Sequence, residues 1–115
     1  MKSFLEFKTV SVSISGDYYQ IMFDDGLYAE GGPYFLIQGE SEFEDDGICY
    51  FESHIENLTG HYIPKSASLS TNTLHISYGE KQPQDVEIRF GLHETDFHEL
   101  ASALMEIIPE TRIER

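Results

Sequence analysis

A period of two in the apolar residues runs through most of the chain and constrains its fold more than any other feature. In residues 10–15 three aliphatic residues alternate with three serines, and residues 19–23 repeat the alternation after a Gly-Asp turn. Successive side chains of a strand point to opposite faces, so this pattern predicts strands with one face against a core. Five further apolar runs lie at 34–39, 48–55, 67–69, 74–78 and 86–90. Together with the first two, they predict six or seven strands.

The period becomes helical near residue 95. Apolar residues then recur at spacings of three and four, and the preceding Thr95 or Asp96 is a plausible N-cap. We expect an α+β fold, a mostly antiparallel β-sheet of six to seven strands with one C-terminal α-helix packed on it. The chain should form a single domain over residues 1–115, with strands at about 4–91, the helix at about 95–108 and a polar tail that frays.

Length and composition place the chain among ordinary globular domains. A chain of 115 residues can bury roughly two-thirds of its unfolded surface in one core. The N-terminus lacks the apolar run of a signal peptide, and no segment reaches the roughly 18 apolar residues of a membrane span. We therefore expect a cytoplasmic protein. Cys49 is the only cysteine, which excludes an internal disulfide, and its apolar surroundings predict a buried structural thiol.

Acidic residues dominate the charge. The formal net charge is −14, and between Lys8 and Lys65 there are 11 acids and no Lys or Arg. Such a field repels phosphates, so nucleic acid and anionic membranes are poor candidate partners, whereas a basic protein or a cation is favoured. Alternatively, the acidity only keeps the domain soluble.

The densest acidic stretch, "ESEFEDDG" at residues 40–47, invites comparison with a calcium loop. Glu42, Glu44 and Asp46 occupy alternate positions, as EF-hand ligands do. However, the closing position that should hold a bidentate glutamate is Ser53, and the flanking segments alternate as strands rather than helices. The pattern therefore does not favour a calcium site.

Other chemistries find little support in the residue spacing. No two of the five histidines have HxH or HExxH spacing, so a zinc site would have to be assembled across strands. Nucleophile-elbow and phosphate-loop motifs are absent, and a carboxylate pair such as Glu42 and Glu52 could arise by chance among 21 acids. We expect no enzyme activity, metal or cofactor, and keep a small metal- or ligand-binding β-sheet domain as the alternative.

A binding surface fits the central segment better. Tyr50, Glu52 and His54 should project from one strand face beside the acidic turn, which would combine aromatic area with uncompensated charge. In the competing interpretation this face packs under the helix and the acids only hydrate the turn. A third possibility is self-association through edge strands.

The order of these features resembles the bacterial polymorphic-toxin immunity proteins, in particular immunity protein family ten. The matching segments are "YFLIQ" at 34–38, "ESEFEDDG" at 40–47, "YFESH" at 50–54, "TGHYI" at 59–63, the two later strands and the closing helix. The resemblance implies a non-catalytic cytoplasmic protein that binds and neutralises a cognate toxin, possibly a basic nuclease. The expected partner-binding residues are Glu42, Glu44, Asp45, Asp46, Tyr50, Glu52 and His54.

Overall fold

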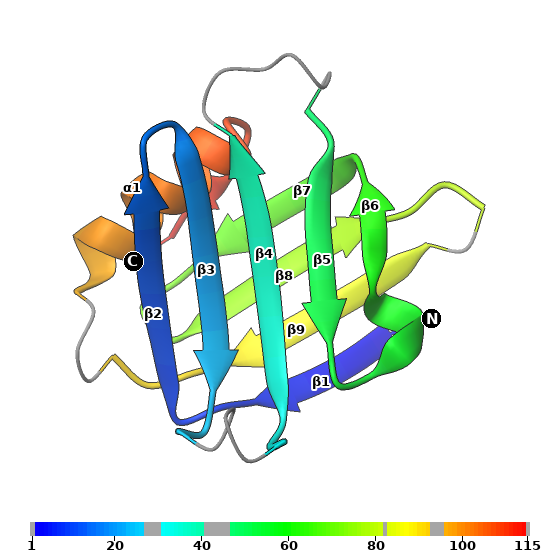
Figure 1. Cartoon of the computed structure of the whole chain (residues 1–115), viewed down its shortest axis with the longest axis horizontal. Coiled ribbons are helices and arrows are strands. Elements are labelled where there is room, and N and C mark those ends of the chain that lie inside the picture. The colour runs from blue at the N-terminus through cyan, green and yellow to red at the C-terminus, as the bar shows by residue number, and fades with distance from the viewer. Residues whose placement is uncertain (1, 27–30, 41–46, 82, 93–95, 115) are drawn as a thin grey trace.

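Two five-stranded sheets face each other in the computed structural model, which describes residues 2–26, 31–40, 47–81, 83–92 and 96–114 (Figure 1). The strands of one sheet run crosswise to those of the other. The front sheet contains, in order, β2 (Thr9–Ser15), β3 (Tyr18–Asp24), β4 (Tyr34–Glu40), β5 (Cys49–Ser53) and β6 (Gly60–Tyr62). The back sheet contains β1 (Lys2–Glu6), β9 (Gln84–Arg89), β8 (Thr73–Tyr78), β7 (Pro64–Leu69) and β10 (Arg112–Ile113).

The front sheet is an antiparallel meander in which each strand pairs with the next along the chain. The register places Ile21 opposite Ile37, and Ile37 opposite Phe51, and all three side chains are fully buried. A row of large apolar side chains therefore faces inward from three neighbouring strands. Because side chains alternate, the residues between them face outward.

The back sheet combines two antiparallel hairpin pairings with parallel strands at both edges. β7, β8 and β9 pair antiparallel, whereas β1 joins β9 and β10 joins β7 in parallel. The chain changes sheets between β1 and β2 and again between β6 and β7. Such corners are typical of sheets that pack crosswise over a shared core.

The helix α1 (Phe97–Ile107) packs against the inner face of β2, β3 and β4 (Figure 1). The Asp96 carboxylate accepts a hydrogen bond from the Glu99 backbone N–H at 2.8 Å and so caps the first turn. At the other end Ile107 fits against Gly39, where a Cβ atom would lie 2.6 Å from the Ile107 Cγ2. The helix therefore depends on a glycine in the facing strand.

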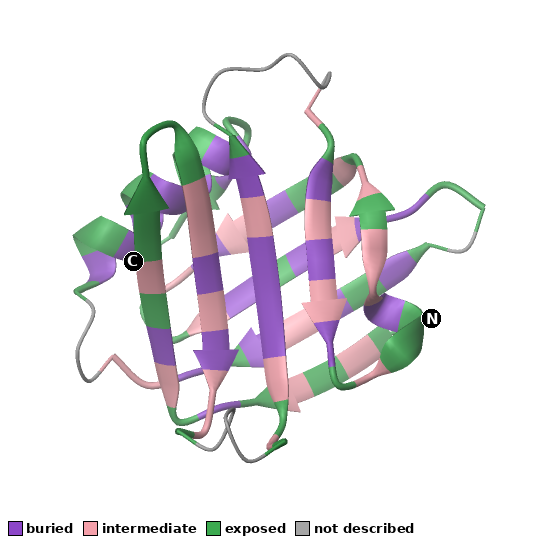
Figure 2. Cartoon of the chain, viewed as in Figure 1, coloured by how far each residue is buried: buried purple, intermediate pink, exposed green. Residues whose placement is uncertain are grey.

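Aromatic rings join the two sheets at the centre of the core, and buried bands cross both sheets in Figure 2. Phe51 of the front sheet stacks on Tyr78 of the back sheet with ring centroids 3.9 Å apart, and the Tyr78 hydroxyl donates to the Leu58 carbonyl at 2.8 Å. Cys49 is buried as expected, and burial raises the pKa of its thiol to about 12. The thiol is therefore protonated, and unreactive, at neutral pH.

The α+β class, the mostly antiparallel strands and the one helix are confirmed, but the expected six or seven strands in one sheet were wrong. The described part of the chain contains ten strands in two sheets. The additional strands are β1, β6 and β10, and β10 lies in the tail that was expected to fray. Within the part of the chain that the structure describes, no helix has the length and apolar character to cross a bilayer.

Candidate functional site

The outer face of the front sheet is covered by polar and aromatic side chains, because these alternate with the inward apolar residues. One row crosses all five strands through the paired residues Ser13, Gln20, Gln38, Tyr50 and His61. A second row places Glu52 opposite Leu36. We name this surface the tyrosine–glutamate face and define it by seven residues: Tyr18, Gln20, Tyr34, Gln38, Tyr50, Glu52 and His61.

Glu52 lies between two tyrosine hydroxyls on this face. Tyr50 donates to Oε1 at 2.6 Å and Tyr34 donates to Oε2 at 2.8 Å. Both bonds favour the ionised carboxylate, and the bond from Tyr50 contributes most to lowering the pKa of Glu52 below its ordinary value of 4.5. The same bond raises the pKa of Tyr50. At neutral pH the face therefore presents a fixed, negatively charged carboxylate.

Hydrogen bonds and ring contacts also fix the neighbouring side chains. The Tyr18 hydroxyl donates to Gln38 Oε1 at 2.5 Å, and Gln38 Nε2 donates to Gln20 Oε1 at 2.7 Å. The rings of Tyr50 and His61 lie 4.8 Å apart between centroids. Side chains ordered in this way lose less conformational entropy when a partner covers them.

The charge of the two sheets is unequal. The five strands of the front sheet contain no Lys or Arg, whereas the back sheet strands contain Lys2, Lys65, Arg89 and Arg112. Among the described residues, the ion pairs join Glu87 to His75 and Arg89, and Arg112 to Glu114. Glu52 therefore has hydrogen-bond donors but no ion-pair partner in the described part of the chain.

Four of the seven expected partner-binding residues lie outside the described part of the chain, and three lie within it. Glu42, Glu44, Asp45 and Asp46 lie outside the described residues, so their position stays a prediction. Tyr50 and Glu52 lie side by side on the outer face of β5. The competing interpretation, in which this face packs under the helix, was wrong because α1 covers the inner face of the sheet.

His54 lies just beyond the end of β5 rather than in the expected row. The backbone N–H of Tyr34 donates to its Nδ1 at 3.1 Å, and its ring meets that of Phe7 edge to face at 6.4 Å. The ring is thus held at the end of the sheet, apart from the hydrogen bonds of Glu52.

The tyrosine–glutamate face also includes residues that the sequence analysis did not select. Tyr18 and Gln20 come from β3, Tyr34 and Gln38 from β4, and His61 from β6. The alternation in residues 19–23 places Gln20 opposite the apolar side chains, whereas the apolar run Phe35, Leu36 and Ile37 obscures the alternation around Tyr34 and Gln38. A comparison of the outward residues of all the expected strands could have found them.

Metal ligation has no evident location in the described residues. Within these ranges, no three His, Cys, Asp or Glu side chains cluster closely enough to hold an ion. The carboxylate of Glu52 is instead surrounded by tyrosine hydroxyls, which are hydrogen-bond donors at neutral pH. The arrangement is suited to recognising a donor-rich cationic group.

Comparisons of the chain with protein-family models, with curated proteins and with solved structures found no match.

Proposed function

We propose that this chain is a non-catalytic binding protein whose tyrosine–glutamate face docks a basic partner protein. We further propose that it works in the bacterial cytoplasm as an immunity protein that neutralises a cognate toxin. The observation that carries the proposal is Glu52, an ionised carboxylate held by two tyrosine hydroxyls on a sheet without Lys or Arg.

The composition of the face supports a protein partner. Tyrosines supply large contact area at low entropic cost, and they are enriched among residues that dominate binding energy. The carboxylate can pair with an arginine or lysine, and the net charge of −14 would speed the approach of a basic protein. The same charge disfavours nucleic acid and anionic membranes as partners. The resemblance to immunity proteins supplies the biological role.

The proposal is tested with the toxin candidate, the protein encoded by the reading frame directly upstream. Co-expression of this chain should restore growth to cells that produce the toxin, and the purified proteins should form a complex. Glu52→Lys should slow association about tenfold at low salt, because it reverses a charge at the centre of the interface. Reversal of Glu44, Asp45 and Asp46 to Lys should slow it at least as much.

A matched control is Glu106→Lys, which makes the same charge change at an exposed position of α1. Association rates measured at low and high salt should separate the two variants, and the difference should shrink as salt rises. Failure to restore growth would contradict the immunity role. Equal rates for the two variants would remove the tyrosine–glutamate face from the interface.

A further inference from the structure

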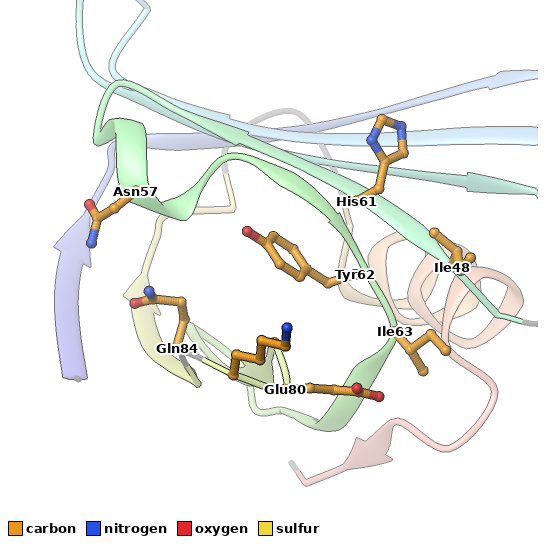
Figure 3. A pocket seen from close by; sticks show the side chains of 9 residues that line it. Ile48, Asn57, His61, Tyr62, Ile63, Glu80 and Gln84 are labelled. Atoms are coloured by element: carbon orange, nitrogen blue, oxygen red, sulfur yellow. The ribbon is translucent and has the colours of Figure 1, made fainter.

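A pocket with a volume of about 540 Å³ opens between the two sheets beside β6, and Figure 3 shows its lining. Its walls come from β6, from the turn between β8 and β9, and from Asn57 in the single-turn helix η2 (Glu56–Leu58). The His61 ring points to the opposite side of β6, toward the tyrosine–glutamate face. Small-molecule sites usually occupy roughly 300–1,000 Å³, so this pocket has the size of a ligand site.

One end of the pocket contains a buried polar group that has no hydrogen-bond partner among the described residues. Gln84 is only 6% exposed, and its Oε1 accepts no hydrogen bond from the described residues. Buried side-chain oxygens almost always have a donor, and an unsatisfied one often marks a functional position. The Asn57 side chain lies at the same end of the pocket (Figure 3). This end therefore favours a ligand that brings an N–H or O–H donor, which Oε1 can accept once the Gln84 amide turns toward the pocket, because the oxygen now has almost no exposed surface.

An aromatic ring and two aliphatic side chains form the rest of the wall. The ring of Tyr62 lies beside those of Tyr78 and Phe51, with centroid distances of 5.3 and 6.4 Å, and extends into the pocket with its hydroxyl on the side of Asn57 (Figure 3). Ile48 and Ile63 line the same pocket, although they are 43% and 49% exposed. A flat apolar ligand could stack on the tyrosine ring and cover both isoleucines.

The charges of the pocket disfavour strongly ionic ligands. Glu80 and Lys81 both line it and carry opposite charges. A single lysine in a chain of net charge −14 offers little to a phosphate, and the same lysine opposes a multiply charged cation. An uncharged or zwitterionic molecule matches this balance.

We propose that this pocket binds an uncharged planar nitrogen heterocycle, which stacks on Tyr62 and donates an N–H hydrogen bond to Gln84. Indoles and nucleobases share this chemistry, because both have a flat ring with an N–H on its edge. The pocket borders the tyrosine–glutamate face at His61, which lines the pocket as well, but the proposed ligand contacts use Tyr62 and Gln84 and do not depend on the immunity role.

The test is an NMR titration of the intact chain with four probes: indole, 1-methylindole, adenosine and adenosine 5′-monophosphate. Indole or adenosine should shift the signals of Tyr62 and the Gln84 side-chain amide, with a Kd of about 1 mM or tighter. 1-Methylindole lacks the N–H and should bind at least fivefold more weakly than indole. The phosphate should weaken adenosine binding to a similar extent. Comparison of indole with adenosine then identifies the favoured kind of ring.

Gln84→Leu provides the matching protein variant, because leucine fills similar space without the acceptor. It should retain the fold, as judged by its NMR spectrum, and lose at least fivefold in affinity for the better probe. The control is Ser13→Leu, at an exposed position of β2. This strand forms the edge of the front sheet opposite β6, so the variant should leave that affinity unchanged. No shift with either indole or adenosine would overturn the proposal. Equal binding of indole and 1-methylindole would do so too.

Discussion

At the scale of single residues, the ionisation of Glu52 gives the tyrosine–glutamate face its charge. Hydrogen bonds from Tyr50 and Tyr34 lower the pKa of this carboxyl in the folded protein. A carboxyl whose pKa is lower in the folded than in the unfolded state stabilises the fold above its unfolded pKa. That contribution disappears as the pH falls through the folded pKa. Stability should therefore decline in acid below about pH 4.5, partly through this group.

Tyr50→Phe tests this coupling because it removes the hydrogen bond that lowers the pKa most. The pKa of Glu52 should move up toward 4.5, as measured by following its side-chain carboxyl carbon in an NMR titration. Tyr18→Phe, which removes a hydroxyl bonded to Gln38 instead, should leave the pKa of Glu52 unchanged. If Tyr50→Phe also left it unchanged, the bond between Tyr50 and Glu52 would not form in solution.

The same residues show how far the sequence alone could define this surface. Alternation within one strand was enough to place Tyr50 and Glu52 on the same face. The donor Tyr34 is 18 positions away from Glu52 in the sequence. The register between β4 and β5 brings the two side chains together. A pattern within a strand does not fix which residues of the next strand lie opposite, because register depends on turns and neighbouring strands. His54 left the expected row because β5 ends at Ser53.

At the scale of elements, the contact between α1 and β4 requires a residue without a side chain at position 39. A Cβ atom there would lie 2.6 Å from Ile107 Cγ2, well inside van der Waals contact. Gly39→Ala should therefore destabilise the protein by about 1–3 kcal/mol, measured by urea denaturation. Ile107→Ala should cost about 2–5 kcal/mol alone, because it leaves a cavity. The double variant should lose less than the sum, since each change relieves part of the other.

Leu100→Ala is the matched control for this cycle. Leu100 is fully buried on the same helix, two turns before Ile107, and is not among the atoms nearest to Gly39. The loss in free energy of unfolding caused by Leu100→Ala should add to the loss caused by Gly39→Ala. Additive costs for Gly39→Ala and Ile107→Ala would instead mean that the helix shifts away from β4.

Two of the three strands that the sequence did not predict, β6 and β10, are too short to carry a periodic signal. β6 has three residues and β10 has two, too few for an alternation to be recognised. β10 is held by its partner, because Arg112 and Ile113 pair with β7 and the Glu114 N–H donates to the Leu69 carbonyl at 2.7 Å. The strands β8 and β9, by contrast, were predicted correctly at 74–78 and 86–90, because both alternate throughout.

At the scale of the whole molecule, the two sheets share one core and should unfold together. Buried residues of both sheets and of α1 belong to a single apolar cluster, and the stack of Phe51 on Tyr78 connects the sheets at its centre. A domain with one core of this size usually unfolds in a single cooperative transition.

Tyr78→Phe tests how strongly the centre of this core holds the sheets. The change keeps the ring stack but leaves the Leu58 carbonyl without the hydroxyl that donates to it at 2.8 Å. We expect a loss of about 1–3 kcal/mol in the free energy of unfolding, because a buried acceptor becomes unsatisfied. Phe51→Ala should cost more, about 3–5 kcal/mol, since it removes the ring itself.

Both variants should still unfold in one step, so the far-ultraviolet signal of the strands and the near-ultraviolet signal of the tyrosines should change at the same urea concentration. The midpoint should fall while the slope of the transition stays that of the parent, because the surface exposed on unfolding is nearly unchanged. Separate midpoints for the two signals would show that the sheets are independent units. The tyrosine–glutamate face would then rest on the front sheet alone, without support from the back sheet behind it.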